Sequence, residues 1–136
     1  MQDRYLFRGK RIDNGEWVQG FYRQYAMYSE CGNCIKKINH FIDTKNGHVS
    51  EYIDPATLGQ CTGLKDKNSR PIYEGDILRQ TDKKGRNDLL VVRYSDKDAA
   101  FYGYTSYGSP RSICYSDCYA EDIGNEHDDK LEDFTP

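Results

Sequence analysis

The stretch of sequence that decides the fold is PATLGQCTGLKDKNSRPIYEGDI, at residues 55–77. Its distinctive residues are turn formers and caps. Just before it, Asp54 can cap a helix, Pro55 fits the first helical position and Gly59 can end the helix, so we expect one short helical turn here. A polar loop follows. Because strand-like segments flank the stretch, we interpret it as the junction of two β units.

The N-terminal unit, residues 1–70, is expected to be a β-hairpin subdomain. Asn-Gly pairs at Asn14-Gly15 and Asn46-Gly47 favour tight hairpin turns, since both residue types tolerate a positive φ. Trp17 is expected to anchor the core. The predicted hairpins join residues 5–8 to 16–22, and residues 36–43 to 48–53.

The C-terminal unit, residues 71–136, is expected to be an SH3-like small β-barrel with an acidic tail. Turn-forming residues recur about every ten positions, which is the rhythm of short strands. Five short strands with tight turns favour a barrel, which hides its edges by closing. The predicted strands are residues 76–81, 89–95, 99–106, 111–115 and 119–124. The predicted fold class is therefore all-β with a short helical turn.

Composition and charge restrict the function classes. The chain of 136 residues is 30% charged, yet it carries 12 Tyr, 5 Phe and 1 Trp, which indicates a packed fold rather than a disordered chain. Residues 1–70 hold 11 Lys/Arg against 8 Asp/Glu, and residues 71–136 hold 8 against 14. The acidic C-terminal part repels phosphates, so nucleic acid is not the expected partner, although a nucleic-acid-binding small barrel remains an alternative.

The expected location is the cytoplasm. No apolar run approaches the ~20 residues of a membrane span. The first residues, MQDRY, lack the apolar stretch of a signal peptide. In the cytoplasm the five cysteines are expected to be thiols or metal ligands rather than disulfides.

Two segments resemble the YopX family, which is found in bacteriophages and prophages of bacteria. They are FRGKRIDNGEWV at residues 7–18 with the following Gly20-Phe21-Tyr22, and the block from Pro55 to Ile77. The ending Ile123-Gly124-Asn125 before an acidic tail is also similar. The resemblance spans residues 7–131 and implies a β-rich, prophage-encoded protein in the bacterial host cell. It supplies no catalytic residue.

The sequence departs from the family pattern in several places. Position 61 is usually aromatic in the family and is Cys61 here, and position 69 is often Gly and is Ser69 here. The remaining four cysteines are not family features. Anything that rests on them belongs to this chain alone.

These four cysteines are the candidate metal ligands. Cys31-Gly32-Asn33-Cys34 has the spacing that places two thiolates on one zinc ion, and Cys114 with Cys118 could complete a four-thiolate site. The alternative is that they are separate small apolar residues. A zinc-stabilised module is therefore a second interpretation, and no other cofactor is expected.

No arrangement of residues predicts an enzyme. His40 and His48 could face each other in one hairpin, but structural roles fit them better. Glu121 and Asp122 are strand neighbours and point to opposite faces. Asp76, next to Glu74, is expected to cap a turn by binding backbone amides. Neither a nucleophile elbow nor a phosphate-binding glycine loop is present in the sequence.

An aromatic cluster is the candidate contact surface. Tyr102 and Tyr104 share one face of a predicted strand, opposite Phe101, and Tyr107 follows. Such tyrosines serve equally as core or as interface residues. The function expected overall is a non-enzymatic protein-binding or adaptor module that contacts an unidentified protein or further copies of itself.

Overall fold

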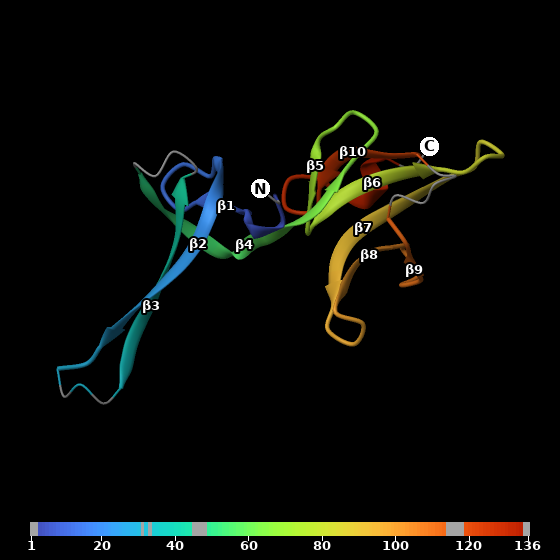
Figure 1. The fold of residues 1–136 in the computed structure, drawn as a ribbon. Helices are drawn as coiled ribbons and strands as arrows, with labels where there is room; N and C mark the ends of the chain where they lie inside the picture. The colour runs from blue at the N-terminus through green and yellow to red at the C-terminus, as the bar shows by residue number, and fades with distance from the viewer. Residues whose placement is uncertain (1–2, 31, 33, 45–48, 114–118, 135–136) are drawn as a thin grey trace. The chain divides into compact units, whose positions relative to one another are not determined.

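The computed structural model describes residues 3–30, 32, 34–44, 49–113 and 119–134 (Figure 1). The chain is almost entirely β, as predicted, and its described helices are two short 3-10 helices, Asp3–Tyr5 and Leu131–Phe134. It divides into two compact units, Tyr5–Gln60 and Cys61–Pro136 with Met1–Arg4. Neither described helix has the length and apolar character needed to cross a membrane.

The N-terminal unit is a closed ring of four antiparallel strands. Both predicted hairpins are present, since β1 pairs with β2 and β3 pairs with β4. In addition β2 pairs with β3, and β1 pairs with β4, which closes the ring. Closure leaves no open sheet edge where the four strands meet. The bounds are β1 (Phe7–Arg11), β2 (Trp17–Tyr28), β3 (Ile35–Thr44) and β4 (Ser50–Lys65).

The helical turn expected at residues 54–59 is wrong, because β4 stays extended through it. Asp54 does bind nearby backbone groups, but these bonds close a bulge in β4 and do not cap a helix. Asp54 Oδ1 accepts the Ala56 amide at 3.0 Å, and the Thr57 hydroxyl donates to the Asp54 carbonyl at 2.7 Å. The same hydroxyl accepts the Lys10 amide at 2.8 Å, so β1 holds this segment in the sheet. Pro55 has no N–H to lose from the ladder.

Small and apolar residues fill the interior of the ring. Ile42 and Ile53 lie on the inner face of the ring and are fully buried. Leu6 and Phe41 are also buried, but Phe41 points to the opposite face of β3 from Ile42. At Gly20 a Cβ would overlap the carbonyl oxygen of Asp43, so β2 and β3 can approach this closely only with glycine.

Trp17 is not the core anchor that the sequence predicts, because it is only half-buried. Its ring lies beneath two cations of β1 instead. The Arg8 guanidinium carbon is 4.8 Å and the Lys10 Nζ 5.4 Å from the ring centroid. Arg8 and Lys10 are two apart on one strand and share a face, which places both over Trp17.

Strands β2 and β3 continue past the ring as a two-stranded arm (Figure 1). Pairing of β2 with β1 ends at Gly20, whereas its pairing with β3 runs on to Tyr28. Likewise β3 pairs with β4 only over residues 41–43. We call residues 21–28 and 35–40 the arm.

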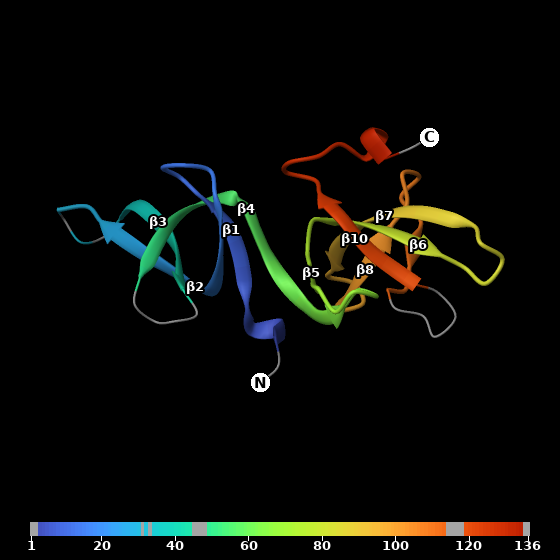
Figure 2. The same cartoon turned by 90° about the horizontal axis from the view of Figure 1, so that it is seen from above.

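The C-terminal unit is built on an antiparallel sheet in the order β10-β6-β7-β8-β9 (Figure 2). This five-stranded arrangement is consistent with the predicted SH3-like fold. Four of the five predicted strands are present. Of the fourth, predicted at residues 111–115, only Arg111 lies in a strand among the described residues, and residues 114–115 lie outside them. The bounds are β5 (Pro71–Tyr73), β6 (Asp76–Thr81), β7 (Asn87–Ser95), β8 (Ala100–Tyr104), β9 (Pro110–Arg111) and β10 (Tyr119–Asn125). Strand β5 pairs with β4.

The core of this unit comes from alternate positions of its strands. Phe101 packs against the core, as expected from its face of β8. The buried members are Ile72, Leu78, Leu90, Val92, Ile113 and Ala120. Between β5 and β6 the chain turns at Gly75, whose φ of 90° is favourable only for glycine. Asp76 then accepts the Tyr73 amide at 2.8 Å, which confirms its predicted capping role.

Candidate interaction surfaces

Asp66, in the most distinctive part of the sequence, ties a loop to strand β10. The residue is buried, and its Oδ1 accepts the amides of Asn68 and Arg70 at 2.9 Å each. Its Oδ2 accepts the Asp122 amide at 3.0 Å. Burial by itself would raise the pKa of Asp66, but the amides of Asp122, Arg70 and Asn68 together hold it below its ordinary value. This residue therefore organises the fold, a role that sequence reasoning missed.

Ser69 lies in the same loop, where the family pattern often has Gly. Its φ is 64°, in the left-handed region that glycine favours. The loop therefore keeps a glycine-like backbone although the residue is serine. Cys61, where the family pattern is usually aromatic, is fully buried beside Tyr73 of β5.

The proposed zinc ligands fall largely outside the part of the chain that the structure describes. This holds for Cys31, Cys114 and Cys118. Cys34 is an exposed free thiol between β2 and β3. Among the described residues, no group of three or more His, Cys, Asp or Glu side chains could hold a metal ion.

The candidate tyrosines lie on β8 and in the turn that follows it. Tyr102 and Tyr104 are half-buried and pack edge to face, with ring centroids 6.2 Å apart at 87°. Tyr107 is 94% exposed. Asp98 raises the pKa of the Tyr102 hydroxyl, chiefly through its charge. Tyr102 and Tyr104 thus form a small aromatic face that Tyr107 does not share.

The paired carboxylates of the sequence have structural partners. Glu121 forms an ion pair with Lys67, with a Nζ–Oε2 distance of 3.3 Å. The neighbouring Asp122 offers its amide to Asp66, as described above. His40 accepts or donates at Nδ1 to the Tyr22 hydroxyl at 2.6 Å, and its ring stacks on that of Tyr22 at 6°. His48 lies outside the described residues.

A shallow hollow of about 260 Å³ lies beside the ends of β1 and β4. It is lined by Ile12, Asp13, Glu51 and Tyr52. Arg11 neutralises both carboxylates of this lining, with distances of 2.6 Å to Asp13 and 3.2 Å to Glu51. What the hollow offers a ligand is therefore mainly the apolar surface of Ile12 and Tyr52.

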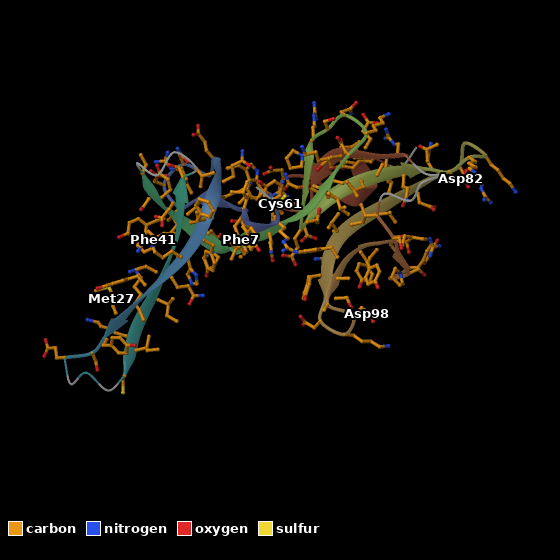
Figure 3. All side chains as sticks on the ribbon, viewed as in Figure 1. Phe7, Met27, Phe41, Cys61, Asp82 and Asp98 are labelled. Atoms are coloured by element: carbon orange, nitrogen blue, oxygen red, sulfur yellow. The ribbon has the colours of Figure 1, made fainter. Side chains whose placement is uncertain are left out.

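The arm presents large apolar side chains on both of its faces. Residues directly opposite in an antiparallel pair point to the same side, and they alternate along the strand. One face carries Phe21, Tyr25 and Met27, and the other carries Tyr28, Ile35 and Ile38. All six are exposed, from 42% for Ile38 to 60% for Tyr28. Met27 lies well out on the arm (Figure 3).

Where the arm joins the ring, its side chains are held by their neighbours. On one face Gln24 donates to the Tyr22 hydroxyl at 2.8 Å, beside the His40 contact. On the other, the guanidinium of Arg23 lies 4.7 Å from the centroid of Phe41 and binds Asp43 at 3.1 Å. The base of the arm is therefore fixed, whereas its apolar residues farther out face solvent.

The chain has a match among solved structures and among protein families. It is similar to a protein of known structure, described as the crystal structure of protein EF1440 from Enterococcus faecalis, at 22% sequence identity and a TM-score of 0.45. The alignment covers 89% of this chain and 92% of that chain. No curated protein sequence matches. Residues 6–131 match the family described as YopX protein, which is nearly the whole chain, so this protein belongs to the YopX family.

Proposed function

We propose that this chain is a non-enzymatic protein-binding module, a phage- or prophage-encoded adaptor that acts in the cytoplasm of the bacterial host. The proposal names the arm as its binding element. The observation that carries it is the exposure of Phe21, Tyr25 and Met27 on one face of the arm, with further apolar residues on the other.

The side-chain types on the arm support a protein partner. Tyr, Phe and Met are enriched where proteins contact one another, because they bury much apolar area. Apolar residues exposed singly need no explanation, but a group of them on one element does. An uncovered two-stranded hairpin is also only marginally stable in water. A partner that covered these faces would stabilise the arm.

A pull-down with matched variants tests the proposal. The tagged protein is expressed in phage-infected or lysogenic bacteria, beside a Tyr25→Ser/Met27→Ser variant and a Tyr107→Ser control. Tyr107 is the most exposed large hydrophobic side chain of the described residues and lies outside the arm. We expect the wild type and the control to retain one stoichiometric second protein that the arm variant loses. Recovery of this chain alone, or equal recovery by all three, would refute the adaptor role.

A further inference from the structure

The hydrogen-bond pattern of the ring fixes which backbone groups of β2 face its outer edge. The Arg11 amide donates to the Glu16 carbonyl at 2.9 Å, so residues 11 and 16 are a hydrogen-bonded pair. In an antiparallel ladder such pairs alternate. Val18 and Gly20 therefore also face β1, and by the same alternation Tyr22, Gln24, Ala26 and Tyr28 face that side after β1 has ended.

The other side of the ring gives the same assignment independently. The Thr44 amide donates to the Val49 carbonyl at 2.9 Å, which makes residues 44 and 49 a hydrogen-bonded pair of β3 and β4. Even-numbered residues of β3 therefore face β4, and odd-numbered ones face β2. Their partners on β2 are odd-numbered too, as in the pair Tyr25 and Asn39. Among the described residues, β2 beyond Gly20 pairs with β3 alone.

The two open edges of the arm differ in charge. The edge of β3 carries adjacent lysines, Lys36 and Lys37, and lysine is the usual guard of an edge strand against pairing. The edge of β2 over residues 21–28 has the sequence FYRQYAMY, in which Arg23 is the single charged residue. One edge is thus protected and the other is open to another strand.

We propose that two copies of this chain pair edge to edge through β2, antiparallel about a two-fold axis at Ala26. The inference rests on the arm as binding element and assigns its open β2 edge, as distinct from its apolar faces, to a second copy. The outward-facing backbone groups allow an axis at Tyr25 or at Ala26, and we place it at Ala26 because Tyr25 then lies opposite Met27. With Gln24 on the axis, Tyr28 of the second copy would fall opposite Gly20, where Phe7 already pairs. With Ala26 on the axis, Tyr28 falls opposite Gln24, whose outward-facing backbone groups pair with no strand of the described residues.

The side chains fit this register. Residues 24–28 pair with the same segment of the second copy, and this segment contains no charged residue. Tyr25 falls opposite Met27 of the second copy, a favourable sulfur–aromatic pair, and the small Ala26 meets its own copy at the axis. The product is a four-stranded sheet in the order β3-β2-β2-β3. Its outer edges are the β3 edges, which the lysines protect, so pairing stops at two copies.

Two proline variants at directly opposite positions test the inference. Ala26 and Ile38 face each other across the arm, and both amides point away from the hairpin. Ala26→Pro removes the amides at the proposed axis, whereas Ile38→Pro removes an amide at the protected edge, and an edge amide tolerates proline. In sedimentation velocity we expect the wild type and Ile38→Pro to dimerise. Ala26→Pro should raise the dissociation constant by about tenfold or more.

A charge exchange covers the case in which a proline variant does not fold. Ala26→Lys and Ala26→Glu each place a charge opposite its own copy, so each variant alone should be a monomer. A mixture of the two should dimerise, because opposite charges then meet at the axis. A monomeric wild type, equal effects of the two prolines, or a monomeric mixture of Lys and Glu variants would overturn the inference. None of these results depends on whether a second protein appears in the pull-down.

Discussion

Asp66 and Asp82 hold two turns of the same construction. Each Oδ1 accepts the backbone amides two and four residues later, all four at 2.9 Å. Each residue also donates its own amide to the carbonyl of that fourth residue, at 2.9 Å. The sequences are DKNSR at 66–70 and DKKGR at 82–86. The residue three positions after each aspartate has a left-handed backbone: Ser69 has a φ of 64° and Gly85 a φ of 79°.

Replacing Ser69 with glycine should stabilise the protein. A left-handed backbone costs a residue with a Cβ roughly 1–2 kcal/mol, and the greater flexibility of unfolded glycine offsets part of the gain. We therefore expect Ser69→Gly to raise the free energy of unfolding by about 1 kcal/mol in urea. The matched control is Gly85→Ser, which should lower it by a similar amount. A destabilising Ser69→Gly would show that the strain is not real.

Replacing Asp66 with asparagine should cost more than the same change at Asp82. In Asp66→Asn the side chain keeps one acceptor oxygen and turns its NH₂ group toward the Asp122 N–H, which leaves a partly buried donor unpaired. Such a loss costs about 1–3 kcal/mol. The second oxygen of Asp82 binds the Arg86 side chain near the surface, where water can replace it. If the two variants lost equal free energy of unfolding in urea, the result would contradict a stabilising role for the hydrogen bond from Asp122 of β10 to Asp66.

Stability should fall in acid through the same carboxylate. The folded-state pKa of Asp66 lies below its ordinary value, so its contribution is present above the unfolded pKa of about 3.9. It is lost as pH falls through the folded pKa. We expect the free energy of unfolding to decline below about pH 5. The decline should be shallower in Asp66→Asn. If the free energy of unfolding fell equally steeply with pH in this variant, Asp66 would not contribute to the loss of stability in acid.

Asp98 should control the titration of Tyr102. Its negative charge disfavours the phenolate and raises the pKa of the Tyr102 hydroxyl. Asp98→Asn should lower that pKa toward the ordinary value of about 10, as followed by NMR of ring-labelled tyrosine. Asp96→Asn, two residues away in the same turn, serves as the control and should leave the Tyr102 titration in place. A larger change of the Tyr102 pKa in Asp96→Asn than in Asp98→Asn would rule out Asp98 as the controlling charge.

Much of the strand pattern could be predicted from the sequence, because turn residues mark each strand end. Strand β6 matches its predicted residues 76–81. The error at Asp54 and Pro55 has a physical cause: the hydrogen bonds that cap a helix also close a bulge in β4. Only pairing with β1, which is distant in sequence, decides between the two.

The arm could not be predicted, because strand length beyond the ring depends on the partner strand. Ile38 and Ile42 are an even number of residues apart on β3 and therefore lie on one face. Ile42 is nevertheless buried, whereas Ile38 is exposed. Ile42 lies within the ring and Ile38 lies beyond it. Which backbone groups remain free on β2 likewise depends on where β1 ends, which the local sequence does not mark.

Amide hydrogen exchange, resolved by residue, tests the β2 pairing most directly. Tyr25 is bonded within the hairpin and should exchange slowly at every protein concentration. Ala26 and Ile38 both point away from the hairpin, but Ala26 alone lies at the proposed two-fold axis. We expect the Ala26 amide to become protected as the protein concentration rises, while the Ile38 amide continues to exchange rapidly. Rapid exchange at both amides at all concentrations would contradict the pairing.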